Sequence, residues 1–132
     1  WKEIFKIIKS KTTQTYIKKN TYYRPWGNYI NFFKGENFLL KELTVNMKSS
    51  ISLQKHHYRA EHWTVTNGKP RITVGNKSFF KNKNESIFIP KGAIHRIENI
   101  YTTPVKIIEA QLGSTLKETD IIRYQDIYGR VK

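Results

Sequence analysis

Hydrophobic and polar residues alternate over short runs through most of the chain after Tyr22. The residues between the runs are rich in Gly, Pro and Asn, which favour tight turns. The runs, rich in Val, Ile, Phe, Tyr and Thr, are residues 28–33, 37–45, 50–54, 62–66, 71–74, 77–80, 86–90, 95–100 and 105–111. Many short strands with regular turns predict an all-β sandwich or barrel.

The two ends of the chain lack this alternation. Apolar residues at positions 1, 4, 5, 7 and 8 have helical spacing, so we predict a short helix or an extended arm over residues 1–21. Residues 22–132 are predicted as one domain, since 132 residues have room for a single core. Residues 116–132 are predicted as a helical turn followed by an irregular end.

The chain is strongly basic, with 24 Lys and Arg against 10 Asp and Glu and a formal net charge of +14. Proteins that bind nucleic acid gather such charge in one patch or on one helix. Here the Lys residues are scattered, so we expect no nucleic-acid partner and a solvated surface that attracts small anions. A binder of nucleic acid or of anionic surfaces is the alternative that the charge alone supports.

The chain contains no Cys, which excludes disulfides and thiolate metal ligands. A bound metal would need nitrogen and oxygen ligands. The apolar runs span only a few residues, and no signal-peptide pattern opens the chain. We therefore expect a cytoplasmic protein that does not insert into a membrane.

The stretch QKHHYRAEHW, residues 54–63, is dense in groups that bind metals. If residues 52–56 form a strand, Gln54 and His56 lie on one face, and Glu61 can return to that face after a bend. His95 follows a Pro-Gly turn where another strand begins. The amide oxygen, the carboxylate and two imidazoles suit a divalent ion, with Zn²⁺ first and Co²⁺, Ni²⁺, Mn²⁺ or Fe²⁺ as alternatives. Any one His taken alone is more typical of a surface or hydrogen-bonded residue.

Two runs resemble the paired motifs of the cupin family. The first is Gln54-x-His56-x4-Glu61-x6-Gly68, with Gln in place of the usual first His. The second is Asn84-x5-Pro90-x-Gly92-x2-His95-x3-Asn99, with Asn in place of the opening Gly. Asn tolerates the left-handed backbone better than most residues, so the exchange is acceptable.

Longer strings resemble the C-terminal domain of type II mannose-6-phosphate isomerases, which is commonly fused behind a mannose-1-phosphate guanylyltransferase domain. The strings are RPWGNY (24–29), SLQKHHYRAEHW (52–63), IPKGAIHRIEN (89–99), IIEAQLGS (107–114) and DIIRYQDIYGR (120–130). The chain departs from the family at Lys48, Lys55 and Tyr58, where Gly, Met and His are usual. The Gly-rich loop of the guanylyltransferase is not found among its residues, so nucleotide transfer is not expected.

The resemblance implies a cupin fold, that is, a double-stranded β-helix or jelly-roll-like barrel. It also implies a metal-dependent aldose–ketose isomerase that interconverts mannose 6-phosphate and fructose 6-phosphate. The alternative is a non-catalytic cupin that binds a sugar phosphate, detached from a fused guanylyltransferase. Cupins often pair through sheet edges, so we expect a homodimer.

Candidate catalytic residues lie in the string RAEH. Arg59 is two residues before Glu61, so alternation predicts it on the ligand face, where it could hold a phosphate or a developing oxyanion. His62 offers an imidazole, which can act as a general base near neutral pH. Alternation turns His62 away from Glu61, so Arg59 is preferred.

Candidate substrate-binding residues are cationic, because phosphate prefers Arg or Lys. They are Arg24, Lys91 and Arg96, although alternation turns Arg96 away from His95. The aromatic rings of Trp26 and Trp63 are predicted to lie in the core or the pocket wall. By the same alternation His57 faces away from the metal.

Overall fold

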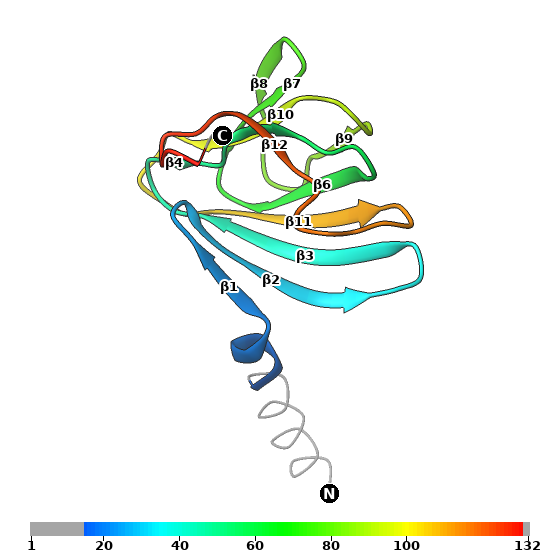
Figure 1. Ribbon diagram of the computed structural model, residues 1–132. Coiled ribbons are helices and arrows are strands. Elements are labelled where there is room, and N and C mark those ends of the chain that lie inside the picture. Colours follow the sequence, from blue (N-terminus) through cyan, green and yellow to red (C-terminus); the bar gives the residue numbers. More distant parts are fainter. Residues whose placement is uncertain (1–14, 131–132) are drawn as a thin grey trace, which may run out of the picture.

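The computed structural model describes residues 15–130, which form two antiparallel sheets stacked face to face (Figure 1). Residues 15–19 are helical and Thr21 already begins a strand, while residues 1–14 of the predicted N-terminal helix or arm lie outside the described residues. Within the described residues no helix is long and apolar enough to cross a membrane. The predicted all-β architecture is confirmed.

Sheet A holds six strands in an order that joins distant parts of the sequence. The order is β1 (Thr21–Arg24), β2 (Gly27–Lys34), β3 (Phe38–Val45), β11 (Val105–Leu112), β6 (Ala60–Asn67) and β9 (Ser86–Ile89). The last long strand therefore lies in the middle of the sheet, between β3 and β6.

Sheet B also holds six strands. Five follow the order β12 (Ile122–Gln125), β5 (Leu53–Lys55), β10 (His95–Asn99), β7 (Arg71–Val74) and β8 (Lys77–Phe80), and β4 (Ser49–Ser50) pairs with β10. The chain alternates between the sheets, so residues from both motif runs face one interior.

Two details of the sequence-based strand assignment are wrong. The predicted strand 50–54 is divided into β4 and β5, because Ser50 pairs with Glu98 while Gln54 pairs with His95 further along β10. The C-terminal segment contains a strand, β12, where a helical turn and an irregular end were predicted. Its partner is β5, so the strand depends on an edge that local sequence does not show.

The interior of sheet A changes from apolar to polar along its strands. One end packs Val45, Val65, Val105 and Ile107 against Ile72 and Ile97 of sheet B, all almost fully buried. Further along the same strands, the inward positions are occupied by buried polar and charged groups, namely Lys41, Glu61, Glu109 and Gln111. The apolar end of the strands therefore forms a hydrophobic core, and their polar end lines a cavity.

At two loop positions the backbone geometry favours the residue that is present. Asn84 has a φ of 72°, the left-handed conformation expected where the motif usually has Gly. A Cβ on Gly113 would lie 2.5 Å from the carbonyl oxygen of Tyr58, so only Gly allows the end of β11 to approach the segment between His56 and Glu61 this closely.

Candidate metal centre

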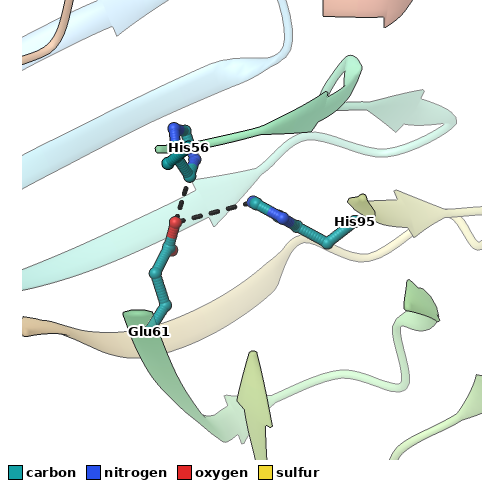
Figure 2. Close-up of side chains that lie close together, drawn as sticks. All are labelled: His56, Glu61 and His95. Carbon is teal, nitrogen blue, oxygen red and sulfur yellow. Dashed lines mark ion pairs between the residues drawn. The ribbon is translucent and has the colours of Figure 1, made fainter. Parts of the chain in front are cut away.

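Three potential metal ligands converge at the polar end of the interior (Figure 2). His56 follows β5, Glu61 lies on β6 and His95 begins β10. All three side chains are buried, and their ligand atoms lie within 4.8 Å of one another. Glu61 Oε1 lies 2.9 Å from His56 Nε2 and 3.5 Å from His95 Nε2.

Main-chain contacts orient both imidazoles. The Nδ1 atom of His56 lies 2.6 Å from the carbonyl oxygen of Asp120, and that of His95 lies 2.9 Å from the carbonyl oxygen of Ala93. A carbonyl oxygen can only accept, so each Nδ1 carries the hydrogen. In a neutral imidazole the lone pair is then on Nε2, the atom turned toward Glu61.

The contacts at Nε2 fit a divalent metal. A carboxylate oxygen and an imidazole lone pair facing each other at 2.9 Å need a shared cation, which is either a proton or a metal ion. The Nε2 of His95 is buried and has no hydrogen-bond partner, which is costly unless another group satisfies it. Two imidazole nitrogens and one carboxylate oxygen are ligands that Zn²⁺ and related ions accept.

Gln54, the fourth predicted ligand, lies beside this cluster. It is on β5 directly opposite His95 in the strand register, and its side chain lines the same cavity. The hydroxyl of Ser52 donates to Gln54 Oε1 at 3.3 Å. The amide therefore faces the interior in which the other three ligands lie.

Arg59 faces the cluster as alternation predicts. Its Nε lies 3.4 Å from Glu61 Oε1, and its Nη2 lies 3.1 Å from His56 Nε2. Burial alone would raise the pKa of the Glu61 carboxyl. The contacts with His56 and His95 and the charge of Arg59 outweigh burial, so the pKa lies well below its usual range. Glu61 is therefore an anion at neutral pH.

A second buried carboxylate lies next to the cluster. The indole N–H of Trp63 is 3.0 Å from Glu61 Oε2 and 2.9 Å from Glu109 Oε1, so one donor lies between two acids. Gln111 Nε2 donates to Glu109 Oε2 at 3.3 Å. Trp63 and Trp26 are both buried, and both line the cavity, which confirms the pocket-wall prediction.

The cavity around these groups has a volume of about 80 Å³. Gln54, His56 and Glu61 line it. So does Lys41, which pairs with Glu118 and lies over the ring of Tyr29. Burial lowers the pKa of Lys41, although the charge of Glu118 opposes this shift. The cavity therefore combines a cluster of possible metal ligands with a buried acid and a buried amine.

The other predicted site residues divide into two groups. Arg24 lines the cavity, where its Nη2 donates to the Tyr29 hydroxyl at 3.1 Å. Lys91 is exposed and does not line it. Arg96 points elsewhere and donates to Gln125 Oε1 at 2.8 Å. The geometry gives Lys91 and Arg96 no support as ligands of a substrate in this cavity.

The two remaining histidines lie outside the cavity lining. His62 is exposed on the outer face of β6, with its ring 4.7 Å from that of Phe88. Successive residues of a strand face opposite sides of the sheet, so His62 points away from Glu61 and the geometry does not support a catalytic role for it. His57 is exposed beside Tyr58, as the same alternation predicts.

The cavity wall contains residues that the sequence did not predict there, among them Lys41, Glu109, Gln111, Arg123 and Arg130. A signal for the first three existed. Lys41 shares its face of β3 with Leu43 and Val45, and Glu109 and Gln111 share theirs with Ile107, so each is a polar residue at an inward position. Arg123 and Arg130 lie in the segment whose strand was not predicted.

Comparison with known proteins indicates the family of the chain. The family model described as "Mannose-6-phosphate isomerase C-terminal" matches residues 11–126. Relatives include the xanthan biosynthesis protein XanB of Xanthomonas campestris, 41% identical over 129 residues, and the mannose-1-phosphate guanylyltransferase ManC of Salmonella typhimurium, 40% identical over 130 residues. Each match covers 98% of this chain, but only 28% and 27% of the relative.

The alginate biosynthesis protein AlgA of Pseudomonas aeruginosa is 45% identical over 108 residues, which is 82% of this chain and 22% of AlgA. The chain thus spans only about a quarter of the length of these relatives.

Solved structures support the fold. The Cnp3 cupin domain of Schizosaccharomyces pombe aligns with a TM-score of 0.63 and 18% identity, covering 65% of this chain and 64% of that one. The capsular polysaccharide assembling protein CapF of Staphylococcus aureus aligns with a TM-score of 0.71 and 19% identity, covering 80% of this chain and 34% of CapF. The predicted cupin fold is confirmed. With the family model matching most of its length, the chain belongs to the mannose-6-phosphate isomerase C-terminal family.

Proposed function

We propose that the chain is a metal-dependent aldose–ketose isomerase that interconverts mannose 6-phosphate and fructose 6-phosphate. The observation that carries this proposal is the buried cluster of His56, Glu61 and His95 in a chain of the isomerase family, with His56 and Glu61 lining a polar cavity. We propose Gln54 as the fourth ligand and Zn²⁺ as the first choice of metal, with Co²⁺, Ni²⁺, Mn²⁺ or Fe²⁺ as alternatives.

The reaction moves a proton between C2 and C1 of the open-chain sugar while negative charge develops on the sugar oxygens. A bound divalent metal supplies Lewis-acid stabilisation of that charge. Arg59 is buried within hydrogen-bond distance of His56, so its guanidinium can hold the same charge from the side. Trp26 and Trp63 contribute aromatic surface to the cavity wall.

Proton transfer needs a titratable group within reach of C1 and C2. We assign this role to Glu109, a buried carboxylate of the cavity wall that lies outside the metal cluster. The indole of Trp63 and the amide of Gln111 each donate to one of its oxygens, which fixes its orientation. Lys41, the other buried candidate, is already paired with Glu118.

A coupled assay for fructose 6-phosphate tests the proposal on chain that has been stripped with a chelator and restored with single divalent metals. We expect metal-dependent turnover that is lost in His95→Ala. His62→Ala is the matched control and retains turnover, because that imidazole lies on the outer face. Stoichiometric metal and sugar-phosphate binding without turnover would favour the alternative, a non-catalytic cupin that binds a sugar phosphate.

A homodimer remains a prediction. Sheet A ends in β1, whose Tyr23 is 77% exposed and whose outer edge has no strand partner among the described residues. Such an edge can pair with a second copy. Sedimentation of the full chain against a Tyr23→Pro variant tests this, with a shift to monomer as the expected result.

A further inference from the structure

The mouth of the cavity carries an arginine that the metal cluster does not use. Arg123 lies on β12 directly opposite Gln54, and Gln54 lies directly opposite His95 on β10. Directly opposite residues of an antiparallel sheet share a face. The three side chains therefore form one row across sheet B, which runs from the metal cluster toward the edge of the sheet.

The guanidinium of Arg123 has a hydrogen-bond donor without an acceptor. Its Nε is buried without a hydrogen-bond partner, and no ion pair joins Arg123 to an acid among residues 15–130. Burial, together with the charge of nearby Arg130, lowers the pKa of the Arg123 guanidinium. An anion bound here would both satisfy the free N–H and compensate the charge.

The neighbouring charges leave the mouth positive. Arg130 is held by Asp126, with Nε and Oδ2 2.6 Å apart, and Lys41 is paired with Glu118. Arg24 also lines the cavity, but its two hydrogen bonds go to neutral oxygens of Tyr23 and Tyr29. Two guanidinium groups, those of Arg24 and Arg123, therefore form no ion pair with a carboxylate of residues 15–130.

A larger hollow shares this arginine with the inner cavity. Arg123, Arg130, Glu118 and Ile121 line both the inner cavity and this hollow, whose volume is about 460 Å³. Pockets for small ligands typically measure roughly 300–1,000 Å³, so the hollow has room for a phosphorylated sugar that the inner cavity lacks.

We propose that Arg123, assisted by Arg24, forms a subsite for the phosphoryl group of a sugar phosphate at the mouth of the cavity. The subsite rests on the proposed function, since it places the reacting carbons of the same substrate at the metal cluster. The spacing agrees, because Arg123 and His95 are two strands apart, about 10 Å between backbones. In mannose 6-phosphate the phosphoryl group follows four carbons and one oxygen after C2, and a planar guanidinium binds phosphate with two N–H groups.

Calorimetric titration of the metal-loaded full chain with mannose 6-phosphate and with mannose tests the subsite. The wild type is expected to bind the phosphorylated sugar more tightly. Arg123→Gln should weaken mannose 6-phosphate binding by about tenfold or more and leave mannose binding unchanged, because only the contact with the charged phosphoryl group is lost. Arg123→Lys keeps the positive charge but lacks the paired N–H groups of a guanidinium. Its affinity for mannose 6-phosphate should therefore lie between those of the wild type and Arg123→Gln.

Arg71→Gln is the matched control, since Arg71 is an exposed arginine of β7 in the same sheet. This variant should bind both sugars as the wild type does. Thermal unfolding of each variant checks that the fold is retained. Equal mannose 6-phosphate binding by wild type and Arg123→Gln overturns the subsite, as does a wild type that does not distinguish the two sugars or binds neither. If the contrast is found but no turnover occurs, the subsite stands and the isomerase proposal fails.

Discussion

The imidazole of His56 and the main chain of Asp120 are 2.6 Å apart, although 64 residues separate them in the sequence. The Asp120 carboxylate also accepts the main-chain N–H groups of His57 and Tyr58, each at 2.9 Å. One residue of the C-terminal segment thus orients a metal-ligand candidate and holds the loop that follows it.

Replacing Asp120 by Ala should therefore weaken metal binding without removing any ligand. The two N–H groups lose their acceptor and the loop carrying His56 loosens, so we expect a loss of about 10- to 100-fold in metal affinity. Competition with a chromophoric chelator measures it. Thr119→Ala, an exposed neighbour, is the control; equal affinity for Asp120→Ala and wild type would show that Asp120 does not position His56.

Glu109→Gln should separate proton transfer from metal binding. The amide keeps the shape of the carboxylate and can still accept from Trp63, but it cannot take up a proton from carbon. We expect turnover of mannose 6-phosphate to fall by about 100-fold or more, within the range of general-base contributions, while metal stoichiometry is unchanged. Glu42→Gln, on the outward face of the neighbouring strand, should behave as wild type. Retained activity in Glu109→Gln would exclude it as the base.

The pair of Asp126 and Arg130 predicts how stability depends on pH. The hydrogen bond from Arg130, with burial opposing it, holds the pKa of Asp126 below its usual range. The pKa of Asp126 in the folded protein is thus below the unfolded value of about 3.9. The stabilisation that the ionised carboxylate gives the fold is therefore present above about pH 4 and is lost as pH falls through the folded pKa. Urea unfolding of Asp126→Asn should show a loss of stability relative to wild type at pH 7 that shrinks toward pH 3. A difference independent of pH would contradict this assignment.

Lys48 stands where the family usually has Gly, and its φ of 53° is in the left-handed region. Its Nζ donates to the carbonyl oxygen of Ile100 at 2.7 Å. Lys48→Gly and Lys48→Ala both remove this bond, but only Gly removes the backbone strain. We expect the Gly variant to exceed the Ala variant in free energy of unfolding by about 1 kcal/mol. Equal values would mean that position 48 carries no strain.

The sequence predicted the strands and metal ligands best where a local pattern carried the information. Turn residues at regular intervals indicated the all-β fold, and the spacing of His56, Glu61 and His95 within two motif-like runs indicated the cluster. Alternation around Glu61 also placed Arg59 inside and His62 outside, because a strand reverses its side chains at each residue.

What the sequence missed depends on contacts between distant segments. Lys41 and Glu109 lie directly opposite each other on β3 and β11, and their shared cavity exists only once these strands pair. Strand β12 forms against β5, which brings Arg123 beside Gln54. Lys91 and Arg96, chosen because they flank His95, lie outside the cavity lining, since nearness in sequence does not set which face a side chain occupies.

Metal titration of the full chain tests the central claim most directly. Isothermal titration of chelator-stripped protein with Zn²⁺, supported by elemental analysis after dialysis, should give one ion per wild-type chain. Binding should be lost in His95→Ala and retained in His57→Ala, a matched histidine that is exposed beside the cluster. A wild type that binds no divalent metal, or a His95→Ala variant that binds it as the wild type does, would contradict the assignment of His56, Glu61 and His95 as a metal centre.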